Sequence, residues 1–224
     1  MNEKKEVGEK AVEYVKDGMV VGLGTGSTVF YTIMKLGQLV QQGLTIKGVP
    51  TSEQTEQLAI ELGIPLGSFE EVEQIDVAID GADEVDPELN LIKGGGGALL
   101  REKIIAAAAK TFIVVADSDK NVDTLGTFPL PIEVVPFGYE MTVKHIKELG
   151  GSLKLRQKDG KTYLTDNGNY IIDSSFQEIM HPRELEKNLN LIPGVVDNGL
   201  FVGMADRVIT FKDKKLTTIV RSNV

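Results

Sequence analysis

Apolar residues in the first half of the chain follow two different periods. Short apolar runs, typical of buried strands, lie at residues 19–23, 44–49, 64–69, 75–80 and 111–117. Stretches with a helical period lie between or beside them, at residues 3–16, 29–40, 52–62 and 98–110. We expect Thr51 and Gln54 to form a capping box at the start of the third helix. Strands that alternate with helices in this way predict right-handed crossovers and a mainly parallel sheet.

The pattern changes where Pro129, Pro131 and Pro136 interrupt it. The elements predicted beyond this point are strands at 132–135 and 152–156, a helix at 139–149, a hairpin at 158–161, two strands around the turn at 166–169, and a helix at 184–190. We therefore predict an α/β fold in which a small α+β (ferredoxin-like) domain is inserted into a larger one. The Rossmann-like, mainly parallel sheet is expected in residues 1–128 plus 199–224, and the inserted domain in 129–198.

Composition excludes several classes of protein. Hydrophobic residues make up 42% and charged residues 25% of the 224, which is ordinary for a soluble globular chain. No cysteine is present, which excludes disulfides, thiolate metal sites and cysteine nucleophiles. A net charge of −9 argues against a nucleic-acid partner. Neither a signal peptide nor an apolar run of membrane length is visible, so we expect a cytoplasmic protein with no membrane partner.

The first candidate site is the turn GLGTGST at residues 22–28, between a predicted strand and a predicted helix. Backbone amides at a helix start, together with the hydroxyls of Thr25, Ser27 and Thr28, are suited to binding an anion. The glycine spacing does not match G-x-G-x-x-G, and no Gly-Lys-Ser/Thr follows. A small phosphate ester therefore fits better than a dinucleotide, although a tight turn with no ligand is the alternative.

A second candidate site lies after the strand at 75–80, in the stretch DGADEVD. Asp80 and Asp83 are three residues apart, and paired carboxylates in one partly dry cavity supply an acid and a base. Two other roles stay open. With Glu84 and Asp86 they form a possible divalent metal site, or they cap the following turn.

The third candidate site is a run of four glycines after Lys93, followed at once by a helix. Such a turn lets the backbone approach a ligand closely, and its amides can stabilise a developing oxyanion. Glu102 lies in the first turns of the helix, as a half-buried general base or as an exposed residue favoured by the helix dipole. Lys120, after the strand at 111–117, is either a ligand-binding cation or a solvated turn residue.

These motifs resemble those of the type A ribose-5-phosphate isomerases. The resemblance covers nearly the whole chain, through GLGTGST, DGADEVD, LIKGGGGALLREK, ADSDK, FPLPIEVVP, TDNGN and IPGVVDNGLF. DGAD followed by KGGGGALLREK is highly specific, whereas GTGST alone is not. The resemblance implies interconversion of D-ribose 5-phosphate and D-ribulose 5-phosphate in the non-oxidative pentose phosphate pathway, without a metal or an organic cofactor. It also implies a homodimer or homotetramer.

The resemblance also assigns roles to individual residues. Glu102 would move a proton between C2 and C1 through an enediolate, and Asp80 and Asp83 would assist ring opening and proton transfer. The residues implied in substrate binding are Thr25, Gly26, Ser27, Thr28, Asp80, Gly81, Ala82, Asp83, Lys93, Gly94, Gly95, Gly96, Lys120 and Lys4.

Other functions compete with this one. One alternative is a module on the same scaffold that senses a sugar phosphate without catalysis. Such a module would lack the catalytic carboxylates, but Glu102, Asp80 and Asp83 are all present. Acyl-CoA transfer through a glutamyl intermediate would need room for a nucleotide and a pantetheine arm. A nicotinamide dehydrogenase is disfavoured by the glycine spacing.

Overall fold

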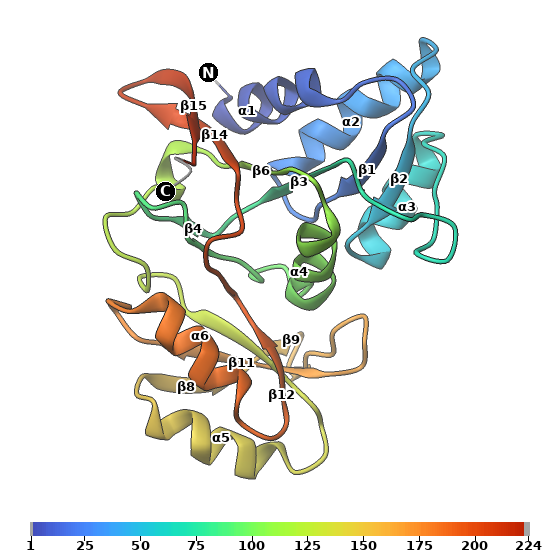
Figure 1. Ribbon diagram of the computed structural model, residues 1–224. Helices are drawn as coiled ribbons and strands as arrows, with labels where there is room; N and C mark the ends of the chain where they lie inside the picture. Colours follow the sequence, from blue (N-terminus) through green and yellow to red (C-terminus); the bar gives the residue numbers. More distant parts are fainter. Residues whose placement is uncertain (1, 222–224) are drawn as a thin grey trace. The chain divides into compact units, whose positions relative to one another are not determined.

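A six-stranded sheet gathers strands from both ends of the chain in the computed structural model, which describes residues 2–221 (Figure 1). Its order is β15-β14-β6-β3-β1-β2. The strands are β1 (Val20–Leu23), β2 (Lys47–Pro50), β3 (Val77–Gly81), β6 (Phe112–Val115), β14 (Arg207–Lys212) and β15 (Lys215–Val220). Neighbours run parallel except β14 and β15, which pair antiparallel. The mainly parallel sheet expected from the sequence is confirmed.

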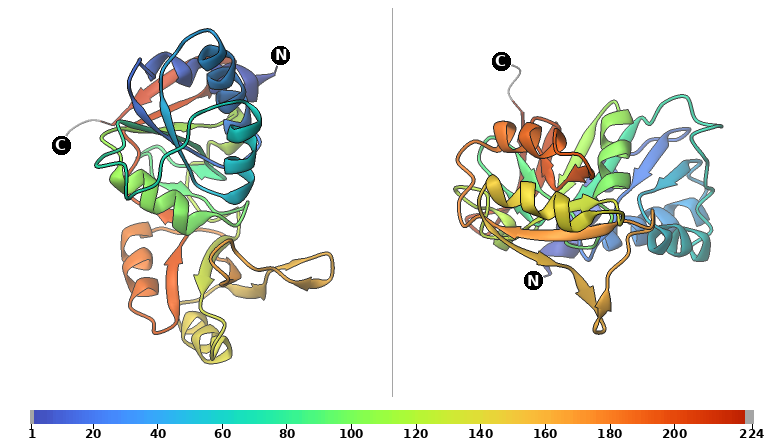
Figure 2. Two further views of the ribbon diagram at one scale, coloured as in Figure 1. Left: turned by 90° about the vertical axis from the view of Figure 1, so that its right-hand side faces the viewer. Right: turned by 90° about the horizontal axis from the view of Figure 1, so that it is seen from below.

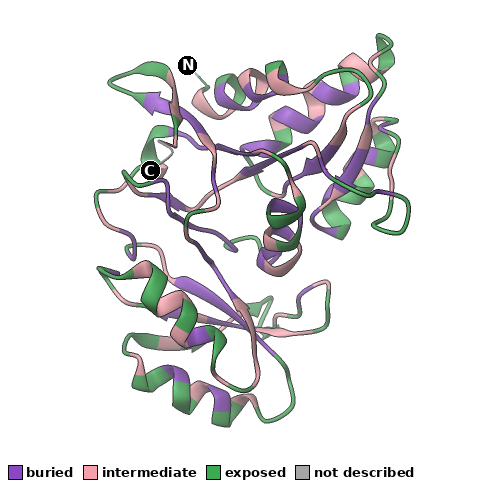
Figure 3. Cartoon of the chain, in the orientation of Figure 1, coloured by how far each residue is buried: buried purple, intermediate pink, exposed green. Residues whose placement is uncertain are grey.

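Helices pack on both faces of this sheet. They are α1 (Glu3–Ala11), α2 (Val29–Gln41), α3 (Glu53–Glu61) and α4 (Leu99–Ala108). Successive side chains of a strand point to opposite faces. Val21 and Leu23 accordingly join a core that includes α1, α2 and α3, whereas an added Cβ on Gly22, between them, would meet Ile105 of α4. These core positions are buried (Figure 3).

The contact between α1 and α2 is unusually close at Gly8. An added Cβ at this residue would lie only 3.0 Å from both the carbonyl oxygen of Thr28 and the Cβ of Tyr31. The hydroxyl of Thr32 donates to the carbonyl oxygen of Gly8 at 2.9 Å. Glycine at position 8 therefore lets the first helix pack directly on the backbone of the second.

A second, four-stranded sheet is antiparallel in the order β12-β7-β11-β8. Its strands are β7 (Leu130–Val134), β8 (Ser152–Leu155), β11 (Tyr170–Ser175) and β12 (Val195–Asn198), and its helices are α5 (Tyr139–Glu148) and α6 (Pro182–Asn190). Ile132 and Val134 of β7 share a core with both helices. Pro131 and Glu133 alternate with them and so lie on the face opposite α5 and α6.

Two small sheets complete this part of the chain. The strands β9 (Gln157–Lys158) and β10 (Lys161–Thr162) form a hairpin that extends away from the four-stranded sheet (Figure 2). A three-stranded sheet pairs β4 (Glu84–Val85) and β13 (Leu200–Phe201) with the central β5 (Leu91–Ile92). Because β5 pairs with β13, the glycine stretch after β5 starts from a fixed position.

The chain divides into two compact units. The first contains Met1–Ala82, Arg101–Asn121 and Met204–Val224, and the second contains Asp83–Leu100 and Val122–Gly203. Compared with the expected inserted domain at 129–198, the second unit also takes in 83–100, 122–128 and 199–203. The pairing of β4 and β5 with β13 explains the inclusion of the first and last of these segments.

Three local predictions differ from the structure. The expected strand at 64–69 is only a single bridge between Gly48 and Leu66. Of the two strands expected around the turn at 166–169, only β11 forms. Helix α3 is capped by Ser52, whose side chain accepts the N–H of Thr55, so the predicted capping box was wrong in register.

Three further observations concern the helices. The expected helix at 3–16 ends at Ala11 and continues as a short 3-10 turn, Val12–Tyr14. Another 3-10 turn, Ser118–Lys120, follows β6. Among residues 2–221, no helix is long and apolar enough to cross a membrane.

Candidate active site

Asp80 holds the turn between β1 and α2 in place. Its Oδ1 accepts the backbone N–H of Thr25 at 3.0 Å and that of Gly81 at 2.7 Å. Gly24 lies so close that an added Cβ would collide with the Asp80 carboxylate. Because β1 and β3 are adjacent parallel strands, their carboxyl ends meet at the same edge of the sheet. Asp80, which is buried, is therefore part of the framework of the turn.

The tip of this turn is open to solvent. Gly26 and Ser27 are exposed, and buried Thr28 directly precedes α2. Gly26 has a φ of 128°, a backbone conformation that favours glycine. The ammonium of Lys4 donates to the hydroxyl of Ser27 at 3.0 Å. Helix-start amides beside a cation are the arrangement expected for binding an anion.

The hydroxyl of Thr25 points into a different group of residues. Its Oγ1 lies 2.7 Å from the hydroxyl oxygens of both Thr51 and Ser52, and 3.1 Å from that of Thr55. Thr55 also donates to the carbonyl oxygen of Gly24 at 2.9 Å. The Thr25 hydroxyl thus joins the turn to the start of α3, a role that the sequence analysis missed. The three hydroxyl residues that follow β2, Thr51, Ser52 and Thr55, were the sequence feature from which this cluster could have been predicted.

Lys4 and Lys120 line one cavity of about 580 Å³. Its lining residues are Asn2, Glu3, Lys4, Asp117, Ser118, Asp119 and Lys120. The carboxylate of Glu3 accepts the N–H of Ser118 at 2.8 Å, and this backbone hydrogen bond lowers the pKa of Glu3. Lys4 also lies 3.9 Å from Asp117. The structure therefore brings the two lysines that the sequence singled out separately into the same cavity.

Glu102 is 4% exposed although it lies in the first turn of α4. Leu99 and Ile105, three residues before and after it, are buried on the same side of the helix, whereas Ile104 is exposed. The carboxylate therefore occupies the inner face of the helix. The alternative of an exposed residue at the helix start is wrong.

Lys93 begins the glycine stretch and is one of the largest fully buried side chains. Its backbone N–H donates to the carbonyl oxygen of Gly199 at 2.9 Å, and its ammonium lies 5.4 Å from the centre of the Phe201 ring. An added Cβ at Gly199 would collide with the carbonyl oxygen of Lys93. Lys93 is thus held closely by the chain around β13.

The glycines after Lys93 form a tight turn. The N–H of Gly97 donates to the carbonyl oxygen of Gly94 at 3.0 Å, and both residues have positive φ, 99° at Gly94 and 85° at Gly97. The N–H of Gly95 donates to Oδ2 of Asp83 at 2.8 Å. Gly95 and Gly96, at the tip, are exposed. Asp83 therefore holds the second glycine turn by a backbone N–H, as Asp80 holds the first.

Glu84 and Asp86 have roles in loop structure. The carboxylate of Glu84 accepts the N–H groups of Gly126 and Phe128. Asp86 accepts the backbone N–H groups of Glu88 and Asn90, so the turn-capping alternative is correct for this residue. Within residues 2–221 there is no cluster of three or more His, Cys, Asp or Glu that could hold a metal ion.

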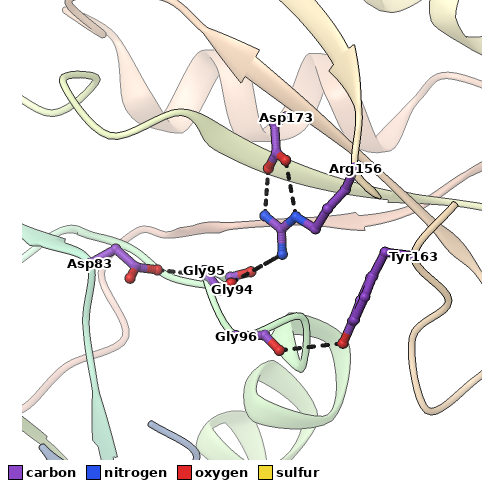
Figure 4. Close-up of polar contacts among 7 residues, drawn as sticks. All are labelled: Asp83, Gly94, Gly95, Gly96, Arg156, Tyr163 and Asp173. Atoms are coloured by element: carbon purple, nitrogen blue, oxygen red, sulfur yellow. Dashed lines mark hydrogen bonds and ion pairs between the residues drawn. The ribbon is translucent and has the colours of Figure 1, made fainter. Parts of the chain in front are cut away.

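Arg156 and Tyr163 also contact the second glycine turn, and the sequence analysis did not identify them (Figure 4). The guanidinium of Arg156 donates to the carbonyl oxygens of Gly94 and Gly95, and the hydroxyl of Tyr163 donates to that of Gly96 at 3.4 Å. Both residues are more than fifty positions away in the chain and belong to no motif of the glycine stretch. No local signal pointed to them.

The candidate residues thus fall into two groups, one in each unit. In the first unit the structure brings together the turn at 25–28, Asp80 and Lys4, with Lys120 beside Lys4. In the second unit it brings together Asp83 and residues 93–96. Ala82 ends the first segment of the first unit, directly before Asp83.

Comparison with known proteins decides the family. Residues 47–215 match the family model described as Ribose 5-phosphate isomerase A (phosphoriboisomerase A). The chain belongs to this family. The ribose-5-phosphate isomerase A of Bacillus mycoides (strain KBAB4) is 53% identical over 210 residues, which cover 93% of this chain and 95% of the relative. The expectation of an isomerase of this family is therefore confirmed.

Solved structures of ribose-5-phosphate isomerases have the same fold. One, described as a complex with phospho-erythronic acid, is 46% identical with a TM-score of 0.95, and the match covers 99% of this chain and 100% of that one. The enzyme from Plasmodium falciparum is 40% identical with a TM-score of 0.94, and the match covers 98% of each chain. The expected α/β fold class is confirmed.

Proposed function

We propose that this isomerase interconverts D-ribose 5-phosphate and D-ribulose 5-phosphate by moving one proton between C2 and C1. The observation that carries the proposal is the burial of Glu102 in the first turn of α4, directly after the second glycine turn. Removing a proton next to a carbonyl requires a base that is shielded from water and donors for the developing oxyanion. Glu102 would supply the base, and the glycine turn would supply the donors.

The phosphate group of the substrate is assigned to the turn at 25–28. The exposed tip at Gly26 and Ser27 precedes α2, and Lys4 donates to Ser27. Amides at a helix start favour a doubly charged anion, and a nearby ammonium adds to that attraction. Lys120, which lines the same cavity as Lys4, is the second cation assigned to substrate binding.

The reaction begins with opening of the sugar ring, in which Asp80 and Asp83 transfer protons between ring and carbonyl oxygens. Glu102 then takes the proton from C2 of the aldose, which leaves an enediolate. The N–H of Gly96, at the exposed tip of the turn, and the charge of Lys93 are the groups assigned to the negative oxygen. Return of the proton from Glu102 to C1, with transfer of a hydroxyl proton, completes the ketose.

The chemistry balances within one molecule. Hydrogen leaves one carbon and arrives at the next, so no external oxidant or reductant is consumed. We further propose that the enzyme acts in the cytoplasm, in the non-oxidative pentose phosphate pathway, as a homodimer or homotetramer. Sedimentation of the purified protein at several concentrations would measure the assembly.

An assay of the purified protein tests the proposal. Ribose 5-phosphate is supplied and ketose formation is followed over time, with unphosphorylated ribose at the same concentration as the control. The proposal expects rapid turnover of the phosphate ester and little turnover of ribose. Equal rates on both sugars would rule out the phosphate site. Binding of ribose 5-phosphate without turnover would instead indicate a sensor.

A further inference from the structure

Arg156 follows β8 and is held in one orientation by Asp173 of β11 (Figure 4). Its Nε donates to Oδ2 of Asp173 at 3.0 Å, and its Nη2 donates to Oδ1. The side chains are only 14% and 22% exposed. A two-point contact of this kind fixes the plane of the guanidinium, which a single-point ion pair does not.

The remaining nitrogen of the guanidinium is directed at the second glycine turn. Nη1 of Arg156 donates to the carbonyl oxygen of Gly94 at 2.9 Å and to that of Gly95 at 3.2 Å. The turn also lies against the four-stranded sheet, on the face opposite α5 and α6, where an added Cβ at Gly94 would be 3.3 Å from Pro131. The arginine is therefore the link between this sheet and two consecutive carbonyl groups of the turn.

This contact fixes the direction of the turn's amides. The peptide unit that joins Gly94 to Gly95 is held at both ends, its oxygen by Arg156 and its N–H by Asp83. In a trans peptide the C=O and N–H bonds point in opposite directions. Holding the oxygen of Gly95 on the guanidinium therefore turns the N–H of Gly96 away from it. Gly96 is exposed, so this N–H is presented to a ligand.

Tyr163 supports the same arrangement from another side. Its hydroxyl donates to the carbonyl oxygen of Gly96 at 3.4 Å, and the guanidinium carbon of Arg156 lies 5.9 Å from the centre of its ring. An added Cβ at Gly97 would collide with the Tyr163 ring. Three successive carbonyl groups of the turn are thus bound by two side chains from the region of the hairpin.

Consecutive glycines have wide conformational freedom, and ordering them costs roughly 0.5–1 kcal/mol each relative to alanine. Stabilisation of an oxyanion requires donors that are already in place before the charge develops. We propose that Arg156 is a positioning residue for isomerisation: it holds the glycine turn 94–97 so that the N–H of Gly96 faces the developing oxyanion, with Asp173 fixing the guanidinium. This inference rests on the proposed function of the glycine turn.

The test compares Arg156→Ala with Lys154→Ala, which removes an exposed cation from β8, two positions earlier. For each protein, kcat and KM for ribose 5-phosphate, the affinity for phospho-erythronic acid and the melting temperature are measured. The planar, charged carboxylate of phospho-erythronic acid resembles the enediolate. We expect Arg156→Ala to lower kcat about 10- to 100-fold, to weaken phospho-erythronic acid binding by a similar factor, and to change KM little. Lys154→Ala should behave like the wild type.

The outcomes separate the two proposals. An inactive wild type would end the proposed function and this inference with it. An active wild type together with an equally active Arg156→Ala variant would overturn this inference but not the proposed function. The same holds if Arg156→Ala has a lower melting temperature than the wild type but an unchanged kcat and unchanged phospho-erythronic acid binding. If Arg156→Ala does not fold, Arg156→Lys decides: a lowered kcat at a wild-type melting temperature supports the inference, and a wild-type kcat overturns it.

Discussion

The carboxylate of Asp80 accepts the backbone N–H of Thr25 at a distance of 3.0 Å, which ties the end of one parallel strand to the turn after its neighbour. The same oxygen accepts the N–H of Gly81. Asp80 is therefore needed for the shape of the turn, in addition to any part in proton transfer. Two different consequences of its removal can be measured.

Asp80→Ala should destabilise the protein and weaken substrate binding. The change removes the carboxylate that accepts two partly buried backbone N–H groups, and a hydrogen bond to a charged group contributes about 1.5–3 kcal/mol. Urea unfolding would measure the loss of stability, and initial rates would measure a rise in KM for ribose 5-phosphate. Unchanged stability and KM would show that the turn does not depend on this carboxylate.

Glu102→Gln should lower turnover by at least ~10²-fold, the usual scale for a general base, while substrate binding stays nearly intact. The amide has almost the same shape but cannot take up the proton. Glu56→Gln is the matched control, because Glu56 lies in the first turn of another helix and is exposed. Near-normal turnover of Glu102→Gln would show that the base lies elsewhere.

Thr55→Val should loosen the first glycine turn without touching its exposed tip. The change removes the donor to the carbonyl oxygen of Gly24 and one neighbour of the Thr25 hydroxyl. We expect a loss of about 1 kcal/mol in the free energy of unfolding and a severalfold rise in KM. Thr162→Val on the exposed hairpin is the control. Identical kinetics of the two variants would contradict the prediction.

Asp76 should make stability depend on pH in the acid range. Its hydrogen bond with Lys110, followed by that with the N–H of Val20, lowers its pKa from the usual 3.8. The pKa of Asp76 is lower in the folded protein than in the unfolded chain. The carboxylate therefore contributes its full stabilisation at a pH above the unfolded pKa, and this stabilisation is lost as the pH falls through the folded pKa. The stability difference between wild type and Asp76→Asn should therefore shrink below about pH 4. Urea unfolding at several pH values would measure it, and a constant difference would be contrary to expectation.

Activity should survive exhaustive treatment with EDTA. Glu84 accepts backbone N–H groups of the distant segment 126–128, and Asp86 accepts those of its own turn, so both carboxylates that would complete a metal site with Asp80 and Asp83 already bind the backbone. The assay is repeated on ribose 5-phosphate after dialysis against the chelator. Loss of activity that a divalent ion restores would revive the metal alternative.

How much the sequence can predict depends on the range of the interaction. Hydrophobic periods of 3.6 and 2 residues located the main helices and strands, respectively. Such a period can be read from a short stretch of sequence, because it reflects the burial of one face of a single element. The burial of Glu102 was left open, since a glutamate in a first helical turn also fits an exposed position. Leu99 and Ile105, which lie three positions before and after Glu102, are both buried, so their spacing was the sequence feature from which the inner face could have been predicted.

Contacts between distant segments were not predictable. The hydroxyl of Thr25 was assigned to a ligand, yet its partners come from the start of α3. Arg156 attracted no notice, because its importance depends on carbonyl groups some sixty positions earlier. The short run at 64–69 looked like a strand but makes only one bridge, since pairing needs a neighbour as well as a suitable composition.

The absence of a side chain at Gly8 determines how deeply the amino-terminal helix sits on its neighbour. Lys4 lies one helical turn earlier on that helix, so the reach of its ammonium toward Ser27 depends on the same depth. A methyl group at position 8 would lie only 3.0 Å from the carbonyl oxygen of Thr28, so the two helices would have to move apart by a few tenths of an ångström, and Lys4 with them. Affinity for the anionic end of a substrate can thus be tuned from a position that never touches it.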